Sequence, residues 1–135
     1  MRFFFDNCLS PHLAKALECM SYETRFGFEI THLRTKFAPN AKDQDWIAAL
    51  AEEGDWVIVS ADTRILTTPH LRAVWKGSGL TAFFFAPWWL GLDRWQQASK
   101  LMELWPEMVT TATNISPGNG FEVAKRKPYF NLLTP

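Results

Sequence analysis

The chain has 135 residues, the length of a single domain, and its 14 basic residues balance its 14 acidic ones. This balance excludes a strongly basic surface that would coat nucleic acids without specificity, although it leaves room for a local basic patch. The 7 Trp and 11 Phe predict an unusually aromatic core or partner surface. Cys8 and Cys19 lack the spacing of zinc ligands, and nothing in the sequence reads as a signal peptide or membrane span. These features predict a cytoplasmic protein.

The chain begins with a short apolar run that ends in an acid. Residues 2–5 show no alternation of polar and apolar side chains, which predicts a strand buried on both faces of a parallel sheet. Because an ionised carboxylate is costly inside such a sheet, we expect Asp6 at the edge where the strand ends. Ser10 and Pro11 then give the N-cap and first-turn signals of a helix over residues 11–20.

The next two expected elements bring further acids. Residues 26–33 alternate apolar and polar side chains, which predicts a second strand with one more exposed face, followed by a loop. Asn40 is expected to cap a helix over residues 41–53. The helical period places Asp43 on the inward, apolar face of that helix and Asp45 on a different face.

The rest of the chain repeats the order of strand and helix. Residues 56–60 form the clearest strand, and Asp62 follows it closely, as Asp6 follows the first strand. Pro106 is expected to kink or restart the last helix, because proline cannot donate a backbone hydrogen bond. The later expected elements are, in order, a short helix over residues 69–76, a strand over 81–86, a loop with Trp88 and Trp89, a helix capped by Asp93 and a short strand over 121–123.

This alternation predicts an α/β fold: a three-layer domain with a central parallel sheet of four to five strands flanked by helices. No internal repeat or long linker divides the chain. We therefore expect a single domain over residues 1–135, with a core to about residue 110 and a C-terminal extension from about residue 111.

Three aspartates are candidates for one site. Asp6 and Asp62 each follow a buried strand, and parallel strands bring their carboxyl ends to the same edge of a sheet. If the two strands are neighbours, the carboxylates meet, and Asp43 joins them from the intervening helix. Two carboxylates about 4 Å apart repel by roughly 4 kcal/mol at an effective dielectric constant near 20, so the cluster needs shared protons or a cation. Oxygen ligands without Cys or His favour Mg²⁺ or Mn²⁺ over zinc.

Each acid also has a purely structural interpretation. Asp6 can bond to the turn that follows it, and Asp43 lies in the first turn of a helix, where the dipole favours a carboxylate. Asp45 reads as a solvated first-turn acid. Asp62 can cap its own turn or pair with Arg64 in a surface salt bridge of little energetic weight.

Three segments together resemble a known family. They are FFDNCLSPHLA at residues 4–14, DQDWI at residues 43–47 and WVIVSAD at residues 56–62. In order and spacing they resemble the compact PIN-like domains related to VapC-type toxin ribonucleases, over about residues 1–86. The resemblance implies that Asp6, Asp43 and Asp62 are the metal ligands and catalytic residues, with Asp45 as the alternative to Asp43. Larger PIN domains carry a fourth acid near the next strand end, where this chain has Phe-Ala-Pro-Trp at residues 85–88.

The expected function is therefore a Mg²⁺- or Mn²⁺-dependent endoribonuclease, the toxin component of a toxin–antitoxin system. The alternative is a non-catalytic PIN-like module that binds a protein through its aromatic second half. The expected partners are RNA, an antitoxin protein and a second copy of the chain in a homodimer. The loop with the two tryptophans is expected either to stack bases or to form core or a protein interface. The candidate substrate-binding residues, whose alternative is ordinary surface charge, are Arg64, Lys36, Arg34 and Arg72.

Overall fold

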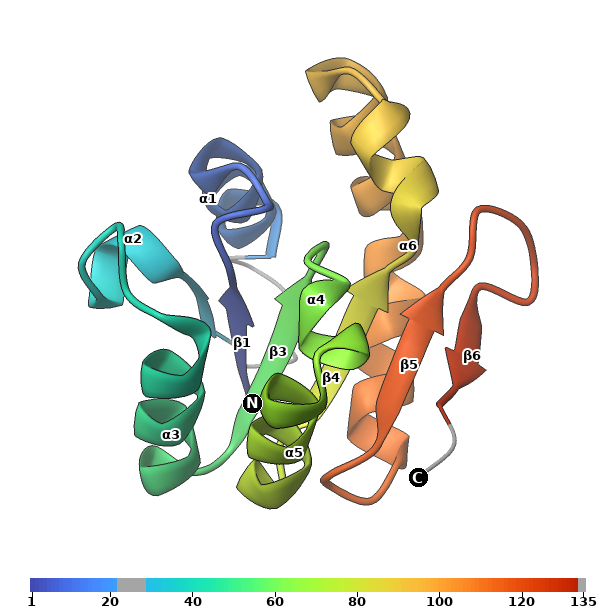
Figure 1. Cartoon of the computed structure of the whole chain (residues 1–135). Coiled ribbons are helices and arrows are strands. Elements are labelled where there is room, and N and C mark those ends of the chain that lie inside the picture. Colours follow the sequence, from blue (N-terminus) through green and yellow to red (C-terminus); the bar gives the residue numbers. More distant parts are fainter. Residues whose placement is uncertain (22–28, 134–135) are drawn as a thin grey trace.

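The computed structural model describes residues 1–21 and 29–133, and within them one sheet has the strand order β2-β1-β3-β4-β5-β6 (Figure 1). Neighbouring strands are parallel from β2 to β5, and β6 pairs antiparallel with β5. The prediction of an α/β fold with a parallel central sheet is confirmed, with six strands in place of four to five. The strands are β1 (Arg2–Phe5), β2 (Glu29–His32), β3 (Trp56–Ser60), β4 (Thr81–Phe85), β5 (Gly120–Val123) and β6 (Phe130–Leu132).

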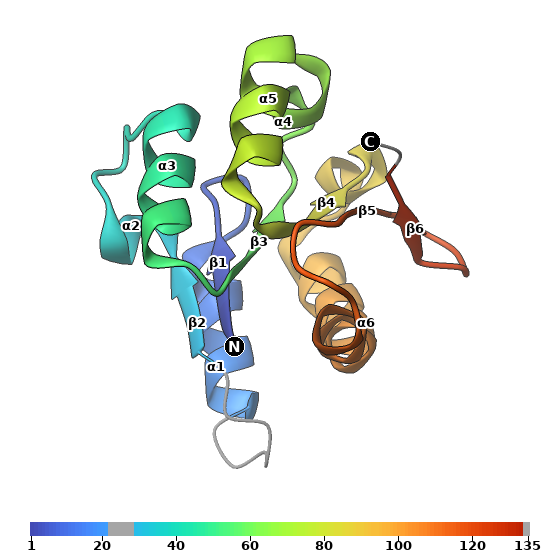
Figure 2. The ribbon, with the colours of Figure 1, turned by 90° about the horizontal axis from the view of Figure 1, so that it is seen from below.

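The helices cover both faces of the sheet. Figure 2 shows α1 and α6 on one face and α3, α4 and α5 on the other. In the described ranges, no helix combines the length and apolar character that a membrane span requires. The helices are α1 (Pro11–Ser21), α2 (Leu33–Lys36), α3 (Asp43–Glu53), α4 (Arg64–Thr67), α5 (Pro69–Ser78), the 3-10 helix η1 (Pro87–Gly91) and α6 (Arg94–Asn114).

The phenylalanines of β1 show why the sheet is buried on both sides. Successive side chains of a strand point to opposite faces. Phe3 and Phe5 therefore pack with residues of α1 and α6, whereas Phe4 packs with residues of α3 and α5. All three side chains are fully buried. The continuous apolar run at the start of the sequence thus belongs to a strand between two layers of helices.

The second strand ends earlier than the sequence predicts. It begins at Glu29, and residues 26–28 of the predicted strand lie outside the described residues. Leu33 does not end the strand but begins α2, where a loop was predicted. The side chain of His32 caps this short helix, because its Nδ1 accepts a hydrogen bond from the backbone N–H of Arg34 at 3.1 Å. Histidine is not among the preferred capping residues, which explains why no helix is predicted here from the sequence.

Two helix boundaries also differ from the prediction. Helix α3 begins at Asp43 with Lys42 at the N-cap, so Asn40 does not cap it. Helix α6 continues through Pro106 as one helix, so of the two predicted effects of the proline, a kink or a restart, the restart is wrong. Buried side chains on both sides of the proline, Trp105 and Met108, anchor the helix to the sheet and offset the missing hydrogen bond. The capping role predicted for Asp93 is confirmed, because its carboxylate accepts from the backbone N–H of Gln96.

Candidate active site

The carboxyl ends of β1 and β3 place two acids side by side. The two strands are parallel neighbours in which Phe5 pairs with Val59. Asp6 continues the ladder by donating its backbone N–H to the Val59 carbonyl at 3.3 Å. Both carboxylates are inside the protein: Asp6 is 3% exposed and Asp62 is 7% exposed. The expected convergence of the two strand ends is therefore present, and it rests on the direct pairing of β1 with β3.

Ser60 connects the two acids. Its hydroxyl donates a short hydrogen bond to Oδ2 of Asp6 and accepts one from the backbone N–H of Asp62 at 2.9 Å. The other oxygen of Asp6 accepts from the backbone N–H of Cys8 at 2.9 Å. Sequence reasoning missed Ser60, although a hydroxyl at the end of an otherwise apolar strand, two residues before an acid, was a usable signal.

The carboxyl group of Asp6 titrates near neutral pH. Burial raises the pKa of Asp6 from its ordinary 3.8 to about 7, and the nearby charges of Asp62 and Asp43 add to the shift. The hydrogen bonds from Ser60 and Cys8 oppose it, because they favour the ionised form. A carboxyl group that is partly protonated at neutral pH is characteristic of functional sites in enzymes.

Asp62 is ionised and already has a cation beside it. The guanidinium of Arg64 donates to Oδ1 of Asp62 from Nε at 2.8 Å and to Oδ2 from a terminal nitrogen at 2.5 Å. These hydrogen bonds hold the pKa of Asp62 below its ordinary value and raise that of Arg64. The Arg64 side chain is itself 74% exposed. Of the two interpretations of Arg64, phosphate contact and pairing with Asp62, the structure shows the pairing.

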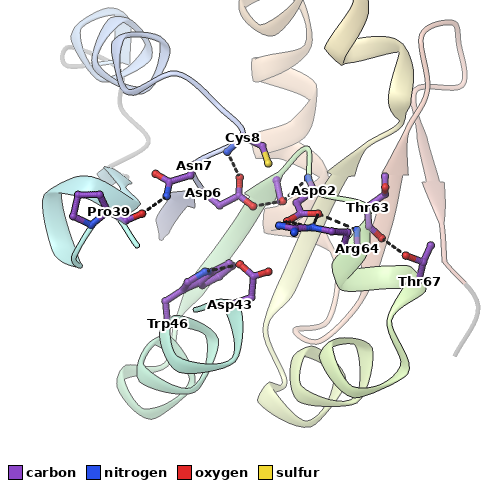
Figure 3. A network of polar contacts seen from close by, with 11 residues as sticks. Asp6, Asn7, Cys8, Pro39, Asp43, Trp46, Asp62, Thr63, Arg64 and Thr67 are labelled. Atoms are coloured by element: carbon purple, nitrogen blue, oxygen red, sulfur yellow. Dashed lines mark hydrogen bonds and ion pairs between the residues drawn. The ribbon is translucent and has the colours of Figure 1, made fainter. Parts of the chain in front are cut away.

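Asp43 approaches the same edge from the first turn of α3. Its Oδ1 accepts a hydrogen bond from the indole nitrogen of Trp46 at 3.0 Å, which fixes the carboxylate above the inward face of the helix (Figure 3). Partial burial raises the pKa of Asp43, and the charge of Asp62 contributes to this shift, so the two acids sense each other. Asp45 is exposed and takes no part in these contacts.

A second set of bonds joins the loops around this edge. The side-chain amide of Asn7 donates to the carbonyl of Pro39 at 2.7 Å and accepts from Nε of Arg34 at 3.2 Å. Arg34 therefore lies beside the residue that follows Asp6. The structure places Lys36 elsewhere, since its ammonium pairs at 2.8 Å with Glu53, the last residue of α3.

The fourth predicted cation, Arg72 on α5, donates to the carbonyl of Leu66 in α4 at 3.5 Å.

His32, which was not among the predicted site residues, is buried at the end of β2. Its Nδ1 accepts a bond from Arg34, so Nε2 carries the proton and donates to the Leu9 carbonyl at 2.7 Å. Burial also lowers the pKa of His32. It is therefore a neutral structural residue with both ring nitrogens engaged.

The carboxylates of Asp6, Asp43 and Asp62 are suitable ligands for a hard divalent cation. Carboxylate oxygens are the ligands that Mg²⁺ and Mn²⁺ prefer, and burial together with mutual repulsion makes a cation beside Asp6 and Asp43 favourable. Within the described ranges no three Asp, Glu, His or Cys side chains are yet gathered as a metal-binding group. The Arg64 guanidinium contacts the Asp62 carboxylate at the position that such a cation would take. A metal ion that binds to Asp62 would therefore have to displace the guanidinium.

Comparison with protein families identifies a match over the N-terminal part of the chain. The family model described as a PIN like domain matches residues 1–87, which contain β1 to β4 and the three aspartates Asp6, Asp43 and Asp62. No curated protein and no solved structure matches the chain. The narrower resemblance to VapC-type toxins remains a prediction.

Proposed function

Since the chain belongs to the PIN-like domain family, we propose that it hydrolyses RNA phosphodiester bonds with the help of Mg²⁺ or Mn²⁺. The observation that carries the proposal is the buried pair of strand-end carboxylates, Asp6 and Asp62, linked through the hydroxyl of Ser60. A structural turn acid does not require burial of this kind, since both side chains could serve a turn at the surface.

The proposed site has metal-binding residues and residues that orient them. Asp6, Asp43 and Asp62 would hold the ion, and Ser60 and Trp46 would keep two of these carboxylates oriented, as hydrogen-bond partners of ligands commonly do. The bound ion would supply Lewis acidity toward the phosphate and lower the pKa of an attacking water. Asp6 would give up its proton when a cation lies beside it, because an opposite charge lowers a carboxyl pKa.

The test is cleavage of single-stranded RNA with Mg²⁺ or Mn²⁺, compared with EDTA. We expect Asp6→Asn and Asp62→Asn to lower the rate by about 100-fold or more, because each removes a charged ligand. Asp45→Asn is the matched control: it removes an exposed acid from the same end of α3 and should leave the rate unchanged. Equal cleavage by the wild type and both strand-end variants would falsify the proposal.

A second candidate function is a non-catalytic PIN-like module that binds a protein partner. Two observations favour it: Arg64 already neutralises Asp62, and no acid follows β4 before η1. This reading predicts that Mn²⁺ binds no more tightly to the wild type than to Asp6→Asn. Saturable binding that depends on Asp6 and Asp62 would exclude it.

The role as the toxin of a toxin–antitoxin system, predicted from the sequence, has its own test. Expression of the wild-type chain in a bacterial host should arrest growth through RNA cleavage, and Asp6→Asn should not. Normal growth with both chains at equal protein levels would contradict a toxin role. Normal growth would not decide whether the protein cleaves RNA, which the cleavage assay tests separately.

A further inference from the structure

The carboxyl edge of the sheet holds a second feature beside the acids. A cavity of about 570 Å³ lies between η1, the first turns of α6 and the segment that follows β5. Its volume is in the range of small-molecule sites. The lining residues that matter here are Trp88, Asp93, Trp95, Lys100, Lys125 and Arg126. None of them belongs to the acidic network.

The sheet places this cavity in line with the acids. In the strand order, β4 and β5 follow β3, and all of them run parallel, so their carboxyl ends share the edge that carries Asp6 and Asp62. Trp88 follows the end of β4, and Lys125 follows the end of β5. Neighbouring strands are roughly 5 Å apart, so two strand spacings separate the end of β3 from that of β5. Figure 1 shows the start of α6 and the β5–β6 connection rising above these strand ends.

The cavity presents one fixed and one exposed indole. Trp88 donates its indole N–H to the Val123 carbonyl at 2.9 Å and packs edge-on against Phe85, so its ring is held in place. Trp95 is 81% exposed, on the first turn of α6. An aromatic ring left in water beside a cavity contributes little to the core and offers its face to a ligand. Nucleic-acid bases stack on such rings without regard to sequence.

The charges around the cavity favour a polyanion. Three of its described lining residues are cationic and one is acidic. Lys125 and Arg126 are exposed, and within the described residues neither forms an ion pair. The acid, Asp93, uses its carboxylate to cap α6. Lys100 reaches Glu103 at 3.5 Å and lies over the ring of Tyr129.

We propose that this cavity binds single-stranded RNA, with a base stacked on Trp95 and the phosphates beside Lys125 and Arg126. The choice of RNA rests on the proposed function, because the same strand would then continue along the edge to the acids. A duplex keeps the faces of its bases stacked inside, so it cannot use the indole in this way. A protein partner would need acidic side chains to meet the two exposed cations, whereas RNA brings a phosphate with every base.

The experiment measures RNA binding in EDTA, so that it does not depend on cleavage. Fluorescence anisotropy of a labelled single-stranded RNA of about ten nucleotides should show a Trp95→Ala affinity about 5- to 100-fold below that of the wild type. Trp95→Phe should recover most of it, because a ring remains. Lys125→Gln with Arg126→Gln should weaken binding and flatten its salt dependence. The matched controls are Leu132→Ala, an exposed apolar residue of β6, and Lys76→Gln, an exposed cation at the far end of α5.

The outcomes separate this inference from the proposed function. Unchanged RNA affinity in Trp95→Ala overturns the inference, and so does equal affinity for duplex RNA or binding of a protein partner through Trp95 without any RNA binding. If the wild type binds single-stranded RNA through Trp95 but cleaves none with Mn²⁺, the inference stands and the proposed function fails. If Trp95→Ala cleaves RNA with an unchanged KM, the inference fails and the proposed function stands.

Discussion

The two halves of one sheet edge are built in opposite ways. At the ends of β1 and β3, the acids are buried, and their oxygens accept hydrogen bonds from a hydroxyl, from backbone N–H groups and from a guanidinium. At the ends of β4 and β5, an indole and two cations are exposed, and the cations form no ion pair within the part of the chain that the structure describes. The ends of β1 and β3 hold carboxylates in fixed positions, whereas the region at the ends of β4 and β5 exposes an aromatic ring and cations to solvent.

This difference separates the demands of chemistry from those of binding. Groups that stabilise a reaction must be positioned before the substrate arrives, which requires burial and hydrogen bonds. Burying Asp6 has a stability cost, and functional sites often carry such costs. A stacking surface requires only an accessible ring and nearby cations, so Trp95 and Arg126 can remain in water. We therefore expect changes at the two regions to have different consequences for stability.

Two tryptophans close in sequence give the largest expected contrast. Trp89 is fully buried and packs on Phe85 with ring centroids 4.4 Å apart, so Trp89→Ala should lower the free energy of unfolding by about 3–5 kcal/mol. Trp95 is exposed, so Trp95→Ala should change it by less than about 0.5 kcal/mol. Urea denaturation measures both values. A loss of several kcal/mol in Trp95→Ala would mean that this ring belongs to the core.

The pH dependence of stability tests the burial of Asp6. Its folded pKa of about 7 lies above its ordinary value of 3.8, so the folded protein keeps a proton over this interval while the unfolded chain has released it. The contribution of Asp6 to stability is therefore full below about pH 4 and is lost as the pH rises to about 7, at up to about 1.4 kcal/mol per pH unit. Asp6→Asn lacks this titration. Its stability relative to the wild type should rise by at most about 4 kcal/mol between pH 4 and pH 7.

The control for the pH experiment is Asp45→Asn, whose exposed carboxylate should leave the profile parallel to that of the wild type. If the free energies of unfolding of the wild type and Asp6→Asn also change in parallel between pH 4 and pH 7, Asp6 is ionised over this whole interval. That result would contradict the raised pKa that follows from its burial.

A smaller effect should follow from removing the cation on Asp62. Arg64→Gln removes the guanidinium from both carboxylate oxygens and leaves only the backbone N–H of residue 64 on Oδ1, so Mn²⁺ should bind about 3- to 10-fold more tightly, a modest gain because the guanidinium is largely exposed. Arg34→Gln is the matched control, since Arg34 donates to Asn7 and, among the residues that the structure describes, forms no ion pair with an acid. Calorimetric titration measures both. Weaker Mn²⁺ binding in Arg64→Gln would mean that Arg64 supports the metal site instead of competing with the ion.

Sequence patterns predicted correctly the strands whose side chains are apolar along their whole length. The continuous apolar runs of β1, β3 and β4 predict buried parallel strands, and the position of Asp6 and Asp62 after two of them predicts where the acids meet. Strand β6 has three residues and pairs antiparallel at the edge of the sheet, so it is too short to show a period. The run of α6 through Pro106 depends on burial of its neighbours, which local propensity does not include.

The candidate site was predictable only in outline. Spacing indicated three acids, but the link through Ser60 and the pairing of Arg64 with Asp62 depend on the directions of side chains at the strand ends. The cavity was harder still to foresee. By the helical period Trp95, Ala98, Met102 and Trp105 fall in one apolar stripe, but in the structure Trp105 is buried and Trp95 is exposed. The first turns of α6 extend past the sheet, so none of the described strands covers that part of the stripe (Figure 1).

The most direct test of the account is a calorimetric titration of Mn²⁺ at neutral pH into the wild type, Asp6→Asn, Asp62→Asn and Asp45→Asn. We predict saturable binding to the wild type and to Asp45→Asn, and its loss in the two strand-end variants. Indistinguishable Mn²⁺ binding by all four proteins would contradict the claim that the carboxyl ends of β1 and β3 form a metal site.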